Sequence, residues 1–243
     1  MLSISVVIPT LNEAARLPAL LEKLAIQTLT AQEIWVCDGN SSDQTAQIAR
    51  DFQSRLPSVR LIECERGTAR QRNCGARRAG AELLVFLDAD DAPPPDFLWN
   101  VARSYQKIPF SIACPWFVAR DAGLFVRAIY LGFNLSFWLS QSTFRMGSGV
   151  CLICPREKFL TCGGFDESLY LGEDIHLIRK LCPRHGLHRH LLIPLETSGR
   201  RFHTDGSLRL LGFYTLISPL ILLGLWKPLQ KMKYRAAPYH KNP

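Results

Sequence analysis

Short, uninterrupted apolar runs recur in the first third of the chain, and polar stretches with helical spacing separate them. Runs without polar alternation are typical of parallel strands that helices cover on both faces. Strands are expected at 4–8, 33–37, 59–64 and 83–87. One helix is expected to begin near Ala14, a second to begin at Ser42 or Asp43, and a third to span 67–80. This strand–helix alternation predicts an α/β fold with a mostly parallel central sheet and right-handed crossovers.

The second half continues the pattern less regularly. We expect helices at 97–105, 124–139 and 158–160, strands at 111–118 and 150–154, and a further helix from Glu173. The stretch 124–139 is apolar nearly all round, with Arg127 as its single charge. Such a helix is either buried or in contact with lipid, and it is too short to span a bilayer. We favour an interfacial or acceptor-contacting helix over a core helix.

A second apolar run carries no charge from Leu210 to Trp226. It has the minimum length for a spanning helix, and Pro219 interrupts it. A tryptophan followed by a basic tail is typical of an anchor at the cytoplasmic membrane interface. A surface hairpin or shallow insertion is the favoured interpretation, with core packing and a true span as alternatives.

Charge and cysteine content narrow the possible partners. The 243 residues carry 29 Lys+Arg against 21 Asp+Glu, a net charge of +8. A basic protein suits nucleic acid, an anionic membrane or a phosphorylated small molecule. The basic residues are scattered without an aromatic stripe, which argues against nucleic acid. The eight cysteines lack a zinc spacing, and no basic segment of a signal peptide precedes the first strand, so we expect reduced cysteines in a cytosolic compartment.

Three carboxylates end the buried run at 83–87. Asp88 and Asp90 are two residues apart, so on an extended backbone they point the same way. Hard oxygen ligands suit Mg²⁺ or Mn²⁺, and such an ion could hold a phosphate-bearing substrate. The alternative is a solvated acidic turn that caps the next helix.

Polar loops follow three of the predicted strands, at 10–13, 38–43 and 88–91. Ligands of parallel α/β sheets bind outside the carboxyl ends of the strands, which predicts that these loops form one site. Asp38 could accept hydrogen bonds from a base or ribose, or it could simply form an Asx turn with Gly39. No glycine-rich dinucleotide or P-loop motif follows the first strand.

The motifs in these loops resemble the family 2 glycosyltransferases, which have a GT-A fold. They are VVIPTLNE at 6–13, DGNSSDQT at 38–45, FLDAD at 86–90, GGFDE at 163–167 and GED at 172–174. The resemblance covers about residues 4–203 and implies a single GT-A (Rossmann-like) domain at 1–205. Its nucleotide-binding half would be 1–95 and its acceptor-binding half 96–205, followed at 206–243 by an apolar, membrane-associating helical segment and a basic tail.

The resemblance also implies roles for particular residues on the donor side. The nucleotide would be held by Pro9, Thr10, Asn12, Glu13 and Asp38. In the basic helix, Arg70 and Asn73 match a G-x-A-x-x-x-N-x-G element, and Arg70 would meet nucleotide or phosphate. A solvated basic face is the alternative for this helix. Asp88 would lie near ribose or metal, and Asp90 would ligate the metal directly.

Further residues are assigned by the same resemblance. Asp174 would be the general base, with Glu173 in support, although carboxylates at a helix start also simply complement its dipole. The family often has another acid at the position of His176. Arg200 and Arg201 would suit a diphosphate, and His203 could complete the metal site; a basic stretch beside the membrane is the alternative. The other histidines of the basic segment are expected at the surface: His185, His188 and His190.

These assignments predict an inverting glycosyltransferase at the cytoplasmic face of the cell membrane. It would use a nucleotide diphosphate sugar, a divalent metal (Mn or Mg) and an acceptor hydroxyl, and a lipid-linked or hydrophobic acceptor would suit the apolar segments. A nucleotidyltransferase is one alternative, disfavoured because no glycine-rich basic loop follows the first strand. The other is a non-catalytic sugar-nucleotide-binding membrane protein, disfavoured by the intact Asp88, Asp90 and Asp174.

Overall fold

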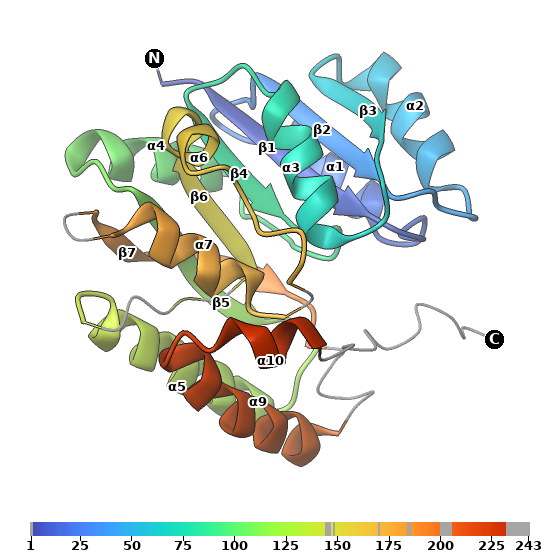
Figure 1. The fold of residues 1–243 in the computed structure, drawn as a ribbon. Coiled ribbons are helices and arrows are strands. Elements are labelled where there is room, and N and C mark those ends of the chain that lie inside the picture. The colour runs from blue at the N-terminus through green and yellow to red at the C-terminus, as the bar shows by residue number, and fades with distance from the viewer. Residues whose placement is uncertain are drawn as a thin grey trace.

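A mixed β-sheet forms the centre of the molecule in the computed structural model (Figure 1). The structure describes residues 2–143, 147, 149–169, 171–183, 186–199 and 206–231. The sheet has seven strands in the order β3-β2-β1-β4-β6-β5-β7. The strands are β1 (Ile4–Thr10), β2 (Glu33–Asp38), β3 (Val59–Glu63), β4 (Leu83–Leu87), β5 (Ile112–Ala119), β6 (Cys151–Pro155) and β7 (His188–Thr197).

The first four strands are parallel, as the apolar runs predict. β1 pairs with β2 and β4, and β2 pairs with β3, all in parallel register. β6 runs antiparallel to β4 and β5, whereas β5 and β7 are again parallel. Thr10 lies opposite Asp38, which lies opposite Glu63, so the carboxyl ends of β1, β2 and β3 are level with one another. The prediction of a single α/β domain with a mostly parallel sheet is confirmed.

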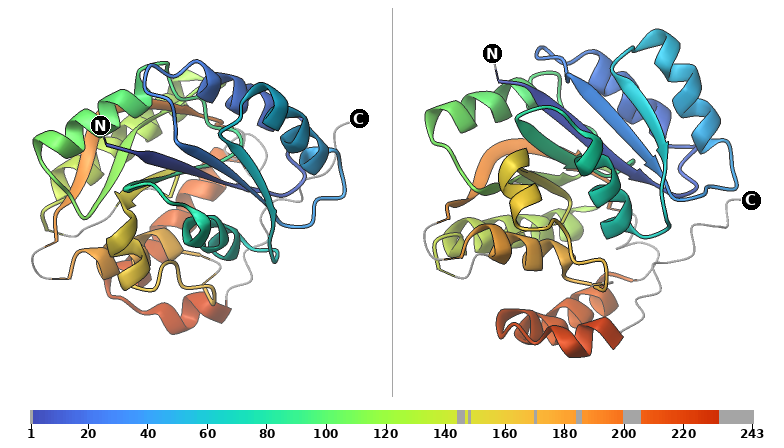
Figure 2. Two further views of the ribbon diagram at one scale, coloured as in Figure 1. Left: turned by 90° about the horizontal axis from the view of Figure 1, so that it is seen from above. Right: turned by 45° about the horizontal axis from the view of Figure 1, so that its top comes forward.

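Helices cover both faces of the sheet (Figure 2, left). α1, α2 and α4 pack on one face, and α3, α6 and α7 pack on the other. α1 buries Leu17, Leu20, Leu21 and Leu24, which recur at helical spacing on its sheet-facing side. The helices are α1 (Leu17–Ala25), α2 (Thr45–Arg55), α3 (Thr68–Arg78), α4 (Phe97–Lys107), α5 (Leu124–Ser140), α6 (Arg156–Thr161), α7 (Glu173–Leu181), α9 (Ser207–Leu222) and α10 (Trp226–Lys231).

β7 corrects the prediction that the histidines of this segment lie at the surface. His188 and His190 are each only 3% exposed, because alternate residues of β7 point into the protein beside β5. The Nε2 atom of His190 lies 3.0 Å from Asn134 Oδ1 of α5, and burial lowers the pKa of His190 to about 4. The sequence does not predict that this strand is buried, because histidine is usually expected at the surface unless a buried partner for it is known. His185 lies outside the described residues.

The C-terminal apolar segment folds back onto α7 instead of standing apart from the domain (Figure 1). Ile217, Ile221 and Leu229 form a buried cluster with Ile175, and the rings of Trp226 and His176 meet edge to face at 4.8 Å. None of the helices within the described residues combines the length and hydropathy needed to cross a bilayer. Residues 232–243, including most of the predicted basic tail, lie outside the described part of the chain.

Candidate functional site

The ends of β1 and β2 are held together by a short network around Asp38. The backbone N–H of Gly39 donates to the carbonyl of Thr10 at 2.9 Å, and the Thr10 hydroxyl donates to Asp38 Oδ1 at 3.3 Å. Asp38 is 3% exposed and also accepts hydrogen bonds from the backbone N–H and hydroxyl of Ser41, at 2.9 and 2.5 Å. Asp38 therefore both stabilises the turn and presents a fixed carboxylate at the rim of the sheet.

The loop after β1 is braced by the loop after β2. Asn12 has a φ of +55°, and its side-chain oxygen accepts the backbone N–H of Ser42 at 2.8 Å. The backbone N–H of Glu13 donates to the Thr45 hydroxyl at 2.8 Å. The carbonyl of Glu13 accepts hydrogen bonds from the backbone N–H groups of Arg16 and Leu17, so a turn that begins near Ala14 leads directly into α1 at Leu17. Pro9 lies opposite Cys37, so the five residues predicted to hold the nucleotide lie at the ends of β1 and β2 and in the loop that follows β1.

Helix α3 supplies two functional residues that the sequence analysis missed. The side-chain amide of Gln71 donates to the carbonyls of Thr10 and Cys37, both at 2.7 Å, and so joins α3 to the ends of β1 and β2. Arg72 is 2% exposed. Ala69, Arg72 and Ala76 share one buried face at helical spacing, and an arginine on such a face was the available signal.

The guanidinium of Arg72 connects three separate segments. Its Nη2 donates to Asp88 Oδ1 at 2.8 Å and to the carbonyl of Gly149 at 3.1 Å. Its Nη1 lies 3.9 Å from Glu173 Oε1. Burial lowers the pKa of Arg72, but the charges of Asp88, Glu173 and Asp174 more than offset this and raise it overall. Arg72 therefore stays charged and draws the end of β4 and the start of α7 together.

The acidic turn after β4 concentrates negative charge. The backbone N–H of Asp88 donates to Asp91 Oδ2 at 2.8 Å, which folds the turn on itself. Asp91 is 2% exposed, and burial together with the charges of Asp88 and Asp90 raises its pKa well above the usual range. Asp88 and Asp90 are partly exposed, and their hard oxygens suit Mg²⁺ or Mn²⁺. The described residues contain no group of three or more His, Cys, Asp or Glu side chains that could hold a metal ion, so an ion here would need ligands beyond these two carboxylates.

Asp174 stands in the first turn of α7, beside the loop that carries Gly149. A Cβ atom at Gly149 would lie only 2.7 Å from Asp174 Oδ2, so this backbone approaches the carboxylate closely. Burial and the neighbouring charge of Glu173 raise the pKa of Asp174 to about 7, against the lowering effect of the Ile175 N–H bond and Arg72. A carboxyl group with this pKa can accept a proton near neutral pH.

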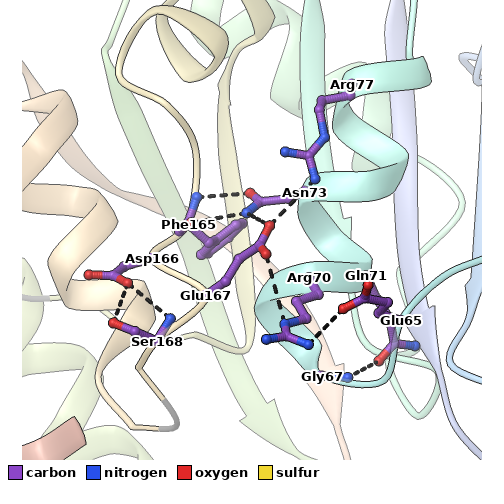
Figure 3. A network of polar contacts seen from close by, with 10 residues as sticks. All are labelled: Glu65, Gly67, Arg70, Gln71, Asn73, Arg77, Phe165, Asp166, Glu167 and Ser168. Atoms are coloured by element: carbon purple, nitrogen blue, oxygen red, sulfur yellow. Dashed lines mark hydrogen bonds and ion pairs between the residues drawn. The ribbon is translucent and has the colours of Figure 1, made fainter.

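Asn73 and Arg70 both contact the loop at 163–168 (Figure 3). Asn73 is 2% exposed; its amide donates to the Phe165 carbonyl and to Glu167 Oε1, both at 2.9 Å, and its oxygen accepts the Phe165 N–H at 2.9 Å. Arg70 pairs with Glu65 at 2.7 Å and lies 3.8 Å from Glu167. The contacts of Asn73 thus hold the loop in place. The side chain of Arg70, by contrast, is 45% exposed beside a cavity of about 120 Å³.

That cavity lies between the start of α3 and the start of α7. Its lining includes Arg66, Thr68, Arg70, Glu167, Leu169 and Glu173. Helix α3 thus links the predicted donor-side residues to the acidic turn and to the predicted base. The remaining predicted site residues, Arg200, Arg201 and His203, lie outside the described residues, so the structure does not place them.

Comparison with known proteins gives a family match and a fold match. The model of the family described as "Glycosyl transferase family 2" matches residues 5–160. Validoxylamine A glucosyltransferase of Streptomyces hygroscopicus subsp. jinggangensis is 38% identical over 106 residues, which is 42% of this chain and 25% of that protein. A PGL/p-HBAD biosynthesis glycosyltransferase of Mycobacterium bovis is 40% identical over 90 residues, or 36% of this chain and 35% of that protein. The chain matches about a quarter to a third of the length of these relatives.

Solved structures share the fold at low sequence identity. The mannosyltransferase PcManGT of Pyrobaculum calidifontis, in complex with GDP-Man and Mn²⁺, superposes with a TM-score of 0.71 at 21% identity, over 93% of this chain and 67% of that one. TarS 1–349 of S. aureus, in complex with UDP-GlcNAc, gives a TM-score of 0.69 at 21% identity, over 82% of this chain and 59% of that one. The GT-A-like fold is confirmed.

Proposed function

The chain belongs to glycosyl transferase family 2, and from this premise we propose that it transfers a sugar from a nucleotide diphosphate sugar to an acceptor hydroxyl, with inversion at the anomeric carbon. The contact of Arg72 with both Asp88 and Glu173 is the observation that carries the proposal. It brings the acidic turn of the donor half next to the carboxylates of α7. A donor at the turn and an acceptor at α7 would then meet across Arg72.

The donor nucleotide would lie over the ends of β1 and β2. Asp38 offers a fixed acceptor for a base or ribose, flanked by Pro9, Thr10, Asn12 and Glu13. Arg70 is close enough to the cavity at the start of α3 to contact a phosphate. For Asn73 we propose a structural role, because its contacts hold the loop that contains Phe165 and Glu167. By family resemblance, Arg200 and Arg201 would bind the diphosphate.

A divalent metal fits the acidic turn. Asp90 and Asp88 would hold Mg²⁺ or Mn²⁺ through hard oxygen ligands, and His203 is proposed as a further ligand by family resemblance. Burial raises the pKa of Asp91 most, and the charges of Asp88 and Asp90 raise it further; a cation at the turn would relieve this repulsion between the carboxylates. When bound, the ion would neutralise negative charge on the departing diphosphate. The complex of the similar PcManGT structure holds Mn²⁺ together with GDP-Man.

Asp174 would act as the general base. Its carboxylate takes the proton of the acceptor hydroxyl as that oxygen attacks the anomeric carbon, and the bond from the sugar to the diphosphate breaks on the opposite side. Burial and the charge of Glu173 keep the pKa of Asp174 raised, and Arg72 limits that rise. A single displacement of this kind inverts the anomeric configuration.

The test is release of nucleoside diphosphate from a panel of nucleotide sugars, with Mn²⁺ or Mg²⁺ and with EDTA. We expect metal-dependent release from one donor, stimulated by an acceptor. Release of pyrophosphate would instead support a nucleotidyltransferase. Calorimetric binding of a donor that is never turned over, even with acceptor fractions present, would support a non-catalytic binding protein.

Two apolar helix surfaces support location at a membrane and a hydrophobic or lipid-linked acceptor. On α5, Leu124, Leu131 and Leu139 are 85%, 50% and 70% exposed. On α9 and just after it, Leu216 and Leu223 are 72% and 74% exposed. None of α5, α9 and α10 contains an acidic residue, and Arg127 and Lys227 are exposed on α5 and α10. We therefore propose that these helices rest on an anionic bilayer, at the cytoplasmic face of the cell membrane.

A further inference from the structure

Gln71 is a buried polar residue whose side chain contacts two parts of the proposed donor site at once. It is 3% exposed and follows Arg70 directly in α3. Its amide nitrogen donates to the carbonyls of Thr10 and Cys37, both at 2.7 Å. Its amide oxygen accepts the backbone N–H of Gly67 at 3.3 Å (Figure 3). The amide is therefore held by three partners from three segments of the chain.

Two of these hydrogen bonds fix the backbone around Asp38. Cys37 directly precedes Asp38, and its carbonyl accepts from the Gln71 amide. Gly39 directly follows Asp38, and its backbone N–H donates at 2.9 Å to the same Thr10 carbonyl that Gln71 contacts. The Gln71 amide thus stabilises the chain on both sides of the carboxylate that is proposed to accept hydrogen bonds from the base or ribose.

The third hydrogen bond fixes the start of α3. Gly67 immediately precedes this helix with a φ of +136°, and the first N–H groups of a helix have no partner within it. The side chain of Gln71 accepts the Gly67 N–H, while the backbone N–H of Gln71 donates to the Gly67 carbonyl at 2.9 Å. Gly67, Thr68 and Arg70 all line the cavity where a donor phosphate is proposed to bind. Gln71 therefore also positions the backbone that carries Arg70.

We propose that Gln71 is a positioning residue that sets the distance between the nucleoside and phosphate parts of the donor site, and so favours a nucleoside diphosphate over a monophosphate. This inference rests on the function proposed above, with the nucleoside at Asp38 and the outer phosphate at Arg70. A ligand that reaches both residues gains affinity when they are held in place before it binds. A monophosphate lacks the outer phosphate, so its affinity depends less on that distance.

Gly39 allows the amide to be displaced without changing Gln71 itself. A Cβ atom at Gly39 would lie 3.0 Å from Cδ and Nε2 of Gln71 and 3.1 Å from its Oε1, which is closer than ordinary van der Waals contact. The amide can move away only by lengthening its three hydrogen bonds. Gly39→Ala should therefore disturb the site when Gln71 is present. In a Gln71→Ala chain the same substitution should have little further effect, because no amide remains to be displaced.

The experiment measures calorimetric binding of nucleotides to the full-length chain in the presence of Mn²⁺. The probes are the diphosphates and monophosphates of uridine, guanosine, adenosine, cytidine and thymidine. Gln71→Met keeps the length of the side chain but removes the amide. It should weaken binding of the preferred diphosphate by roughly tenfold, and that of the corresponding monophosphate by less than about threefold. The KM for the donor sugar nucleotide should rise with the loss of diphosphate affinity, while kcat changes far less.

Two matched controls separate this contact from the general effect of each substitution. Gln47→Met is the control for Gln71→Met, because the amide of Gln47 is exposed and donates to Asp51 within α2. Gly132→Ala is the control for Gly39→Ala, because a Cβ atom at Gly132 would meet nothing within 4 Å. Both controls should bind the diphosphate and the monophosphate as the wild type does.

A purely structural role for Gln71 would lower the fraction of folded protein, which calorimetry records as a lower stoichiometry at unchanged affinity. That result would overturn the proposal, as would equal losses of diphosphate and monophosphate affinity. Additive effects of Gly39→Ala and Gln71→Ala on diphosphate affinity would also contradict it. A wild type that binds none of the diphosphates would overturn the proposed function itself. Full diphosphate affinity in Gln71→Met, beside a wild type that binds, would overturn only the role of Gln71.

Discussion

The Nη2 atom of Arg72 lies 2.8 Å from Asp88 Oδ1, so a buried cation of α3 holds the acidic turn at the end of β4. The same guanidinium also faces Glu173 and donates to Gly149. Its removal deprives Asp88 and Glu173 of their ion pairs with Arg72. Arg72→Gln should cost about 2–3 kcal/mol of folding free energy, less than a fully buried pair would, because Asp88 is 39% exposed.

Arg72 should also control the pH dependence of transfer. Its charge lowers the pKa of Asp174, whereas Glu173 raises it. Arg72→Gln should move the acidic limb of kcat/KM upward by roughly 0.5–1 pH unit. Arg72→Lys keeps the charge and should leave that limb in place while weakening the contact with Asp88. An unchanged limb in a folded Arg72→Gln protein would contradict this role.

Asp174 should set the pH at which the enzyme works. A general base acts when it is ionised, so the rate should rise with pH through about 7, the pKa of Asp174. Asp174→Asn should lower kcat by roughly 10²–10⁴-fold. The measurement is a pH–rate profile of the wild type and single-pH kinetics of the variant. Near-normal turnover by a folded Asp174→Asn protein would exclude this residue as the base.

The same substitution should stabilise the fold. The folded protein holds a proton on Asp174 up to about pH 7, whereas the unfolded chain releases it near its ordinary, lower pKa. The folded state thus binds more protons between these values, and stability falls as the pH rises through that window. Asp174→Asn removes this loss and should gain on the order of 1–3 kcal/mol at pH 8 but little at pH 4. Denaturant unfolding at the two pH values measures the difference.

Gly149 tests whether the position of Asp174 matters separately from its charge. The Cβ atom of Gly149→Ala would lie 2.7 Å from Asp174 Oδ2, so the carboxylate must move. We expect kcat to fall by roughly tenfold or more, with donor affinity changed far less. Gly132→Ala in α5 is the control, because a Cβ atom there would meet nothing within 4 Å. Equal effects of the two substitutions would argue against a close approach at Gly149.

Asn73 should prove to be a structural residue. Asn73→Ala leaves the buried N–H and carbonyl of Phe165 without their partner, and should destabilise the protein by about 2–3 kcal/mol. Arg77→Ala removes only an exposed contact with Glu167 and should cost less than about 1 kcal/mol. Chemical denaturation compares the two. If Asn73→Ala raises the KM for the donor without loss of stability, direct contact with the nucleotide would be the better interpretation.

Membrane binding can be tested on α5. A Leu131→Glu/Leu135→Glu pair introduces two charges into the exposed apolar surface of that helix, and should weaken flotation with anionic vesicles by roughly tenfold or more. Ile26→Glu is the matched control, since Ile26 is an exposed apolar residue at the C-terminal end of α1. The helix α1 itself lies well away from α5 (Figure 1). Wild-type binding should increase with anionic lipid and decrease with salt. Flotation unaffected by the α5 pair would argue against this surface.

Local pattern alone was enough for much of the fold and for the chemistry of the rim. The run Leu83–Leu87 has the bounds that the sequence predicts, because a strand covered on both faces needs an unbroken apolar run between polar turns. Asp38 ends β2 and Asp88 follows β4, two parallel strands on either side of β1, so their place at one edge of the sheet follows from chain direction. The family resemblance added roles that spacing by itself leaves open.

Tertiary contacts decided the rest. Arg72 and Gln71 carry no motif that marks them as more important than Arg70. Their roles depend on distant partners such as Gly149, 77 residues from Arg72, and Thr10, 61 residues from Gln71. His190 belongs to a basic segment whose sequence resembles that of a surface loop. Only its pairing with β5 shows that the segment is a strand. The periodicity of a sequence indicates which face of a helix or strand is buried. It does not indicate which distant residue will pack against that face.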